Sequence, residues 1–244
     1  MSKIIDHEKE KEMSQNSKKK ITIAICVAAV AVITMFAIVA VGMFRDFDAQ
    51  KYVRSVLNQT FKGEVEEMMT VVDDKTEEEL LQQYEDGVVA FVENNVIAGV
   101  EMDEELRKKY VVLCKEVFAS MKYDVKEAEK ISKKEYHVPV SYQTPDVFEK
   151  FMESLSAEFT RLTDKANKGE YQEGSVEEIN LQMEKEFLSN AYELLRTAVS
   201  EATYGEEETI VFVVKANEND LFVIEEGQLN EFILKIMGLD EIQD

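Results

Sequence analysis

The sequence predicts an α+β protein, with a single N-terminal transmembrane helix followed by a helix-rich domain. Three observations support this fold class. Residues 21–44 form an apolar run that holds no charged residue and no proline. Most of the chain beyond it places apolar residues three and four positions apart, which is the period of amphipathic helices. Two stretches instead predict β-hairpins: residues 123–142 alternate with a period of two around a turn, and residues 209–224 hold a short apolar strand, a turn and a returning strand. Together they predict a four-stranded antiparallel sheet.

The apolar run is long enough to cross a bilayer. Its 24 residues would span about 36 Å as a helix, against a hydrocarbon core of about 30 Å. Three lysines at positions 18–20 precede it, and such a cluster is expected to stay on the cytoplasmic side. We therefore predict a short cytoplasmic tail (residues 1–20), a transmembrane helix (21–44) and an extracellular α+β domain (45–244), so that the protein is single-pass in the cell membrane with its N-terminus inside.

Two other interpretations of the apolar run are less favourable. A cleaved signal peptide has an apolar region of about 7–15 residues, and residues 40–42 match a cleavage site poorly. A lipoprotein signal needs a small residue before its cysteine, whereas Ile25 precedes Cys26. Cys26 is therefore expected to be an apolar residue of the membrane helix.

The charge balance restricts the partners of the outer domain. The chain has a net charge of −22, and the first 20 residues hold six lysines and four acidic residues, so the remainder carries about −24. Such a field repels nucleic acid and anionic lipid. Beyond the apolar run there is one cysteine, Cys114, which excludes an internal disulfide and suits a Gram-positive bacterial surface.

The first half of the outer domain is predicted to be helical. Helical spacing runs from residue 46 to 61, and Gly63 is expected to end that helix. Thr76 and Glu79 form a capping box that begins a second helix. Asp103 begins a third, whose apolar stripe includes Cys114, so this thiol is expected to be buried and inert.

The second half mixes strands with two long helices. The first hairpin has strands over residues 123–131 and 136–142, and Pro139 predicts an edge strand or a bulge. Thr144-Pro145 is expected to start a helix with proline at its first position, and Ser175 with Glu178 a second one that reaches Tyr204.

The last part of the chain holds the second hairpin. Residues 209–216 are apolar on both faces, which predicts a central strand. Residues 217–220 form a turn, residues 221–224 return, and a short helix ends at Gly238. The two hairpins are expected to form one four-stranded sheet with helices on one face.

Several local motifs resemble uncharacterised extracytoplasmic domains of Gram-positive bacterial proteins. They are Tyr52-Val53 with Leu57, Lys62-Gly63-Glu64, Lys122-Tyr123-Asp124-Val125 and Tyr136-His137-Val138-Pro139-Val140. In that family the domain follows a lipoprotein signal or a single membrane helix, and the resemblance implies no catalytic residues. The order of helices before strands is also similar to the nuclear-transport-factor-2-like superfamily.

The sequence offers no constellation of catalytic, cofactor-binding or metal-binding residues. Its two histidines are His7, in the predicted tail, and His137, on the polar side of a predicted strand, and no serine lies in a Gly-flanked strained turn beside them. One histidine and one cysteine outside the membrane cannot form a zinc site, and there is no Gly-rich phosphate loop. We therefore predict no catalytic residues, no cofactor and no metal.

Two polar or acidic features of the sequence are candidate sites. Asn217, Asn219 and Asp220 resemble the start of a calcium loop, but Phe222 stands where the loop requires glycine, so a hairpin turn is expected. Carboxylates are plentiful enough for a paired-carboxylate hydrolase, although the chain has no tryptophan to stack on a sugar.

These observations favour a membrane-anchored extracellular domain that binds a protein or small-molecule partner at the cell envelope without catalysis. No nucleic acid is expected among its partners. The alternatives are a carboxylate-based envelope hydrolase and an accessory subunit of a membrane complex. The last would use small residues of the membrane helix, namely Ala24, Ala28, Ala31 and Gly42.

Overall fold

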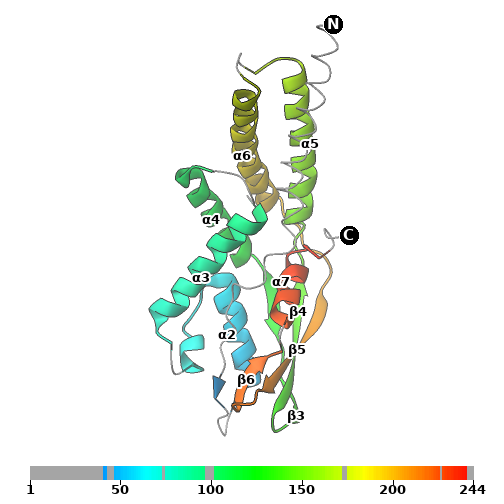
Figure 1. Cartoon of the computed structure of the whole chain (residues 1–244). Helices are drawn as coiled ribbons and strands as arrows, with labels where there is room; N and C mark the ends of the chain where they lie inside the picture. Colours follow the sequence, from blue (N-terminus) through cyan, green and yellow to red (C-terminus); the bar gives the residue numbers. More distant parts are fainter. Residues whose placement is uncertain are drawn as a thin grey trace.

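The protein has an α+β fold in which helices cover one side of a curled antiparallel sheet (Figure 1). A computed structural model describes residues 41–42, 47–72, 75–96, 102–171, 175–225 and 227–240. The helices are α2 (Ala49–Lys62), η3 (Met68–Thr70), α3 (Glu77–Phe91), η4 (Val92–Val96), α4 (Glu104–Ala119), α5 (Val147–Asn167), α6 (Val176–Ser200) and α7 (Gln228–Ile236). The strands are β1 (Val41–Gly42), β2 (Lys122–Val125), β3 (Glu129–Ser132), β4 (Glu135–Gln143), β5 (Glu208–Ala216) and β6 (Leu221–Ile224).

The sheet has six strands among the described residues, so the prediction of four was wrong. Its order is β1-β6-β5-β4-β2, and β3 pairs with β4 beside β2. Both predicted hairpins are present, and pairing of β4 with β5 joins them, with Val138 opposite Phe212. The prediction that residues 209–216 form a central strand is confirmed, because β5 lies between β4 and β6.

A bulge explains why the first predicted strand is divided in two. β2 and β3 both pair with β4, and the chain between them leaves the ladder opposite Pro139. The Lys126 N–H donates to the Pro139 carbonyl at 2.9 Å. Because proline has no N–H to return, regular pairing stops there. Pro139 therefore marks a bulge within a central strand, not an edge strand.

The last residues of the predicted membrane span belong to the sheet. Val41 pairs with Phe222 and Gly42 with Leu221, which makes β1 an edge strand. The prediction that the apolar helix continues to residue 44 was therefore wrong, and Gly42 is not available to a helix–helix contact. Residues 21–40 lie outside the described residues. Among the described helices, none combines the length and apolar character that a membrane crossing requires.

The core lies between the inner face of the sheet and the helices α2, α3, α4 and α7, and it also includes buried residues of α5 and α6. Edge-to-face ring contacts connect the layers. The ring centre of Phe232 in α7 is 5.4 Å from that of Phe212 in β5 and 6.1 Å from that of Phe61 in α2. Gly63 caps α2 in a left-handed conformation, as predicted. The capping box of Thr76 with Glu79 is also confirmed.

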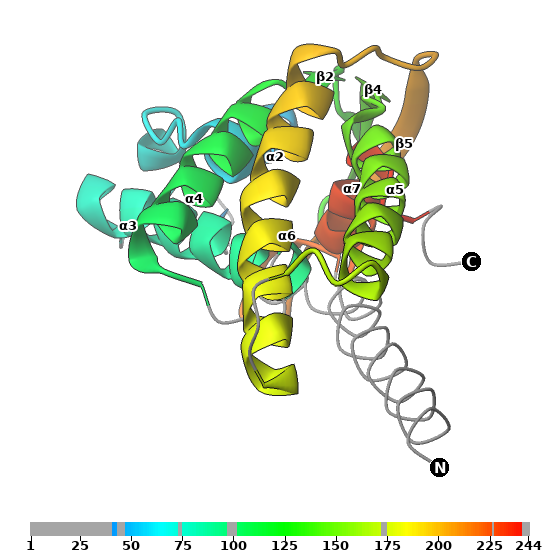
Figure 2. The ribbon, with the colours of Figure 1, turned by 90° about the horizontal axis from the view of Figure 1, so that it is seen from above.

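Helices α5 and α6 form an antiparallel hairpin that extends from the body (Figure 1). Seen from above, α6 lies between α4 and α5 (Figure 2). The capping box of Ser175 with Glu178 begins α6 as predicted, but the helix ends at Ser200 and not near Tyr204. Pro145 is also outside its predicted helix, since it bridges Tyr204 in an extended conformation and α5 begins at Val147.

Candidate functional site

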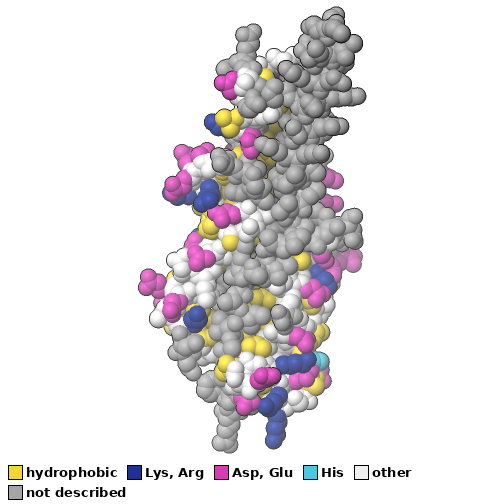
Figure 3. Space-filling model, in the orientation of Figure 1, with side chains coloured by type: hydrophobic (Ala, Val, Ile, Leu, Met, Phe, Trp, Pro, Cys, Tyr) yellow, Lys and Arg dark blue, Asp and Glu magenta, His cyan; other side chains and the backbone are white. Residues whose placement is uncertain are grey.

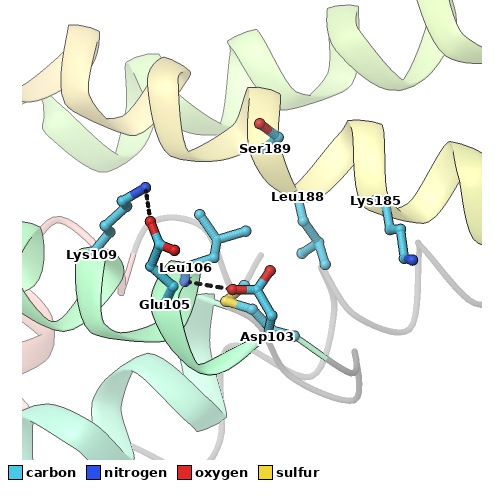
Figure 4. Close-up of a pocket in the computed structure, with 8 residues that line it drawn as sticks. Asp103, Glu105, Leu106, Lys109, Lys185, Leu188 and Ser189 are labelled. Atoms are coloured by element: carbon cyan, nitrogen blue, oxygen red, sulfur yellow. Dashed lines mark hydrogen bonds and ion pairs between the residues drawn. The ribbon is translucent and has the colours of Figure 1, made fainter.

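A cleft lies between the start of α4 and the middle of α6, and we call it the α4–α6 cleft (Figure 4). It has a volume of about 430 Å³ and is partly open to solvent. The side chains that line it come from two segments far apart in sequence: Met102, Asp103, Glu105, Leu106 and Lys109 from the α4 side, and Lys185, Leu188 and Ser189 from α6.

Local sequence places the α4 side of the cleft. Asp103 is the N-cap of α4, and its Oδ1 accepts from the Leu106 N–H at 2.9 Å. This bond satisfies one of the free N–H groups at the helix start. One turn further, Glu105 pairs with Lys109 at 2.9 Å, an i,i+4 arrangement of helix neighbours. Both carboxylates of the cleft are therefore engaged within α4.

A buried tyrosine holds the two walls together. The Tyr110 hydroxyl donates to the Leu188 carbonyl at 2.9 Å, and the Tyr110 ring meets Tyr192 edge-to-face at 5.4 Å. Burial raises the pKa of Tyr110, so it stays a neutral donor. This contact sets the spacing of α4 and α6 below the cleft.

The cleft combines apolar side chains with polar and charged ones, and polar surface predominates in its lining. Leu188 is buried and Leu106 half-buried, and Leu188 and Lys185 extend from α6 toward the α4 side (Figure 4). The Glu105 hydrogen bond raises the pKa of Lys109, so that lysine remains charged and paired. Lys185 is exposed and has no ion-pair partner among the described residues. Its ammonium is thus a charge that an acidic group of a ligand can neutralise.

Two other carboxylates, Glu158 and Glu186, lie close together between α5 and α6. If the protein were a paired-carboxylate hydrolase, one of them would have to act as a general acid. Arg161 donates to Glu158 at 2.7 Å and to Glu186 at 2.8 Å, and Lys165 contacts Glu186 at 2.6 Å. Asn190 also donates to Glu158 at 2.7 Å. Hydrogen bonds from Arg161 lower the pKa of both glutamates. A general acid needs a raised pKa, so this cluster acts as a clamp between helices.

The residues singled out in the sequence lie apart from the α4–α6 cleft. His137 is on the outer face of the sheet, with its Nε2 3.1 Å from Glu135 Oε1. Cys114 is fully buried, and burial raises the pKa of its thiol to about 12. This agrees with the prediction that the thiol is buried and inert. His7 and Cys26 lie outside the described residues.

The turn with calcium-like residues is a hairpin turn, as predicted. Asn217 Oδ1 accepts from the Asn219 N–H at 2.9 Å and from the Leu221 N–H at 3.0 Å. The side chain therefore closes the turn between β5 and β6. In the part of the chain that the structure describes, no group of three or more His, Cys, Asp or Glu side chains could hold a metal ion.

Sequence reasoning missed the α4–α6 cleft. Leu181 and Leu188 share one side of α6, and Lys185 lies between them on that side. A lysine that interrupts an apolar stripe is a signal for a polar edge. It does not by itself indicate a cleft, because the facing wall is some 80 residues earlier in the chain.

No family model and no curated protein matches the chain. Among solved structures, it is similar to a candidate lipoprotein (ycdA) from Bacillus subtilis subsp. subtilis str. 168. The TM-score is 0.45 and the identity 11%, with 78% of this chain and 56% of that chain covered. So distant a similarity transfers neither a fold nor an activity, and the resemblances to Gram-positive extracytoplasmic domains and to the nuclear-transport-factor-2-like superfamily stay predictions.

Proposed function

We propose that this protein is a membrane-anchored extracellular domain that binds a partner or ligand at the cell envelope through the α4–α6 cleft, without catalysis. The anchor is the uncharged run of residues 21–40, with Lys18, Lys19 and Lys20 on its cytoplasmic side. The observation that carries the binding function is the cleft itself, which places the apolar side chains of Leu106 and Leu188 beside an ammonium with no ion-pair partner among the described residues.

The chemistry of the cleft defines the class of ligand. Leu106 and Leu188 offer apolar contact, while Lys185 offers a charge-assisted hydrogen bond. The other charges on the rim, Glu105 and Lys109, already neutralise each other. The cleft therefore suits an amphipathic ligand with one acidic group, such as a small carboxylate or the acidic side chain of a peptide segment.

Site-specific photocrosslinking in intact cells tests this function. Benzoylphenylalanine replaces Ser189, which lines the cleft, in the full-length chain. The matched control replaces Thr197, which is also exposed on α6, two turns away, and does not line the cleft. We expect an adduct of defined mass at position 189 and none at position 197. The mass identifies a small molecule, a peptide or a membrane protein, and the last would favour the accessory-subunit alternative.

A charge reversal gives the second readout. Lys185→Glu should abolish the adduct at position 189, because it places a carboxylate where the acidic group of the ligand binds. The control Lys168→Glu changes an exposed lysine at the end of α5 and should leave the adduct unchanged. Equal crosslinking at positions 189 and 197, or an adduct indifferent to Lys185→Glu, would contradict a binding role for the cleft.

A further inference from the structure

The point where the chain joins the sheet lies beside the turn between β3 and β4. Gly42 of β1 pairs with Leu221 of β6. Asp220, which directly precedes Leu221, forms an ion pair at 2.6 Å with Lys134 of the β3–β4 turn. Strands β1, β6 and β3 accordingly lie at the same end of the molecule, opposite the tips of α5 and α6 (Figure 1). The apolar run of the sequence ends directly before β1, so this end of the sheet is the one nearest to a membrane anchor.

The segment that runs through β3 and its turn into β4 is more basic than the rest of the chain, and the acidic residues Glu135, Glu218 and Asp220 lie next to it at the same end. Residues 126–134 hold four lysines and two glutamates, in a chain whose net charge is −22. We call Lys130, Ile131, Lys133 and Lys134 the hairpin tip. All four side chains are exposed, and Ile131 retains 46% of its accessible surface. Lysine or arginine side chains are visible at this lower end in the space-filling view, with aspartate or glutamate side chains among them (Figure 3).

Two lysines of the hairpin tip are available to bind an external anion. Lys134 is occupied by Asp220. Lys130 lies over the ring of Tyr136, with its ammonium 5.3 Å from the ring centre, and makes no ion pair with the described residues. Lys133 likewise has no ion-pair partner in the described ranges, and it sits at the turn itself. An exposed isoleucine between cationic side chains is the pattern of a segment that meets a lipid surface.

We propose that the hairpin tip rests on the bilayer in which the chain is anchored, with Lys130 and Lys133 on the phosphates of anionic phospholipids and Ile131 at the interface. This inference rests on the membrane anchor of the proposed function. The acidic remainder of the domain is repelled by the same surface, so the two forces orient the domain with its sheet end down. In that orientation the α5–α6 hairpin points away from the membrane, and the α4–α6 cleft is held clear of the lipid.

The absence of tryptophan from the sequence allows a direct test. The full-length chain carries Ile131→Trp as its sole tryptophan and is reconstituted into vesicles of phosphatidylcholine with phosphatidylglycerol, with and without brominated acyl chains. The matched control is Val112→Trp on α4, where the native side chain is even more exposed, at 56%. We expect a blue-shifted emission, quenched by bromine, for Ile131→Trp and not for Val112→Trp.

A second pair of measurements tests the role of charge. When Lys130→Gln and Lys133→Gln are added to the Ile131→Trp chain, the binding of the hairpin tip to the lipid surface should weaken roughly fivefold for each lysine removed. For the Ile131→Trp chain itself, vesicles of phosphatidylcholine alone should abolish most of the quenching. Quenching that persists in both cases would overturn the proposed contact with lipid phosphates.

Flotation of the same vesicles separates this proposal from the proposed anchor. Protein that floats with the vesicles but shows no quenching at position 131 refutes contact by the hairpin tip and leaves the anchor intact. Protein that does not float refutes the anchor, and the hairpin-tip proposal fails with it.

Discussion

Gly63 is the position where one added methyl group should be most damaging. It ends α2 with φ at 66°, and its N–H and that of Glu64 bond back to Gln59 and Asn58. A Cβ placed on Gly63 would lie 2.8 Å from two ring atoms of Tyr84, which is closer than carbon atoms approach. Tyr84 is only 7% exposed and has Lys115 over its ring, so it cannot move aside freely.

The expected cost of Gly63→Ala has two parts. The left-handed backbone conformation costs a residue with a side chain about 1–2 kcal/mol. Forcing a methyl group against a packed ring adds about 1–3 kcal/mol. Gly169 provides the matched control, since its φ is 70° but nothing lies within 4 Å of its added Cβ. Gly169→Ala should therefore lower the unfolding free energy only by the cost of the left-handed backbone conformation.

The assay is urea unfolding of the full-length chain in detergent, followed by far-ultraviolet circular dichroism. We expect Gly63→Ala to lower the unfolding free energy by about 2–5 kcal/mol and Gly169→Ala by about 1–2 kcal/mol. In a Tyr84→Leu background the two substitutions should become similar, because the ring that clashes is gone. Equal losses for both glycines in the wild-type background would refute the packing argument.

Three further substitutions test other contacts. Arg161→Ala should lower the unfolding free energy at pH 7 by about 1 kcal/mol, since its ion pairs are partly exposed. Arg161 holds the pKa of its two glutamate partners low, so the difference between wild type and variant should shrink as the pH falls below about 4.3. Urea melts at pH 7 and pH 3 measure this difference. In a Cys26→Ser background, Cys114 should resist iodoacetamide at pH 8 until urea unfolds the chain, and rapid native-state labelling would contradict its burial. Phe47→Ala removes a ring whose centre is 4.1 Å from that of Phe222, and it should lower the unfolding free energy by about 2 kcal/mol in the same melts. An unchanged midpoint would show that this contact does not hold β1 and its neighbours in place.

The candidate site was the least predictable part of the protein. Asp103 could be identified as a helix cap from its position before an apolar stripe, and the structure confirms that role. Its place on the wall of a cleft depends on Leu188, which approaches through the hydrogen bond to Tyr110. No local pattern encodes a contact between residues 78 positions apart.

The sequence by itself determined where most helices and strands begin. The caps at Thr76, Asp103 and Ser175 are all present, because a cap depends on a side chain and a backbone N–H three residues apart. Period-two alternation likewise located β4, and a short run that is apolar on both faces located β5, since both patterns lie within the strand itself.

The tertiary structure alone decided how those elements combine. The pairing of Val41 with Phe222 turned the end of an apolar run into an edge strand, and Pro139 divided a predicted strand only because β2 and β3 lie beside it. The α4–α6 cleft and the hairpin tip beside Gly42 arose in the same way. These features depend on the free energy of contacts between distant segments, which local propensity and periodicity do not contain.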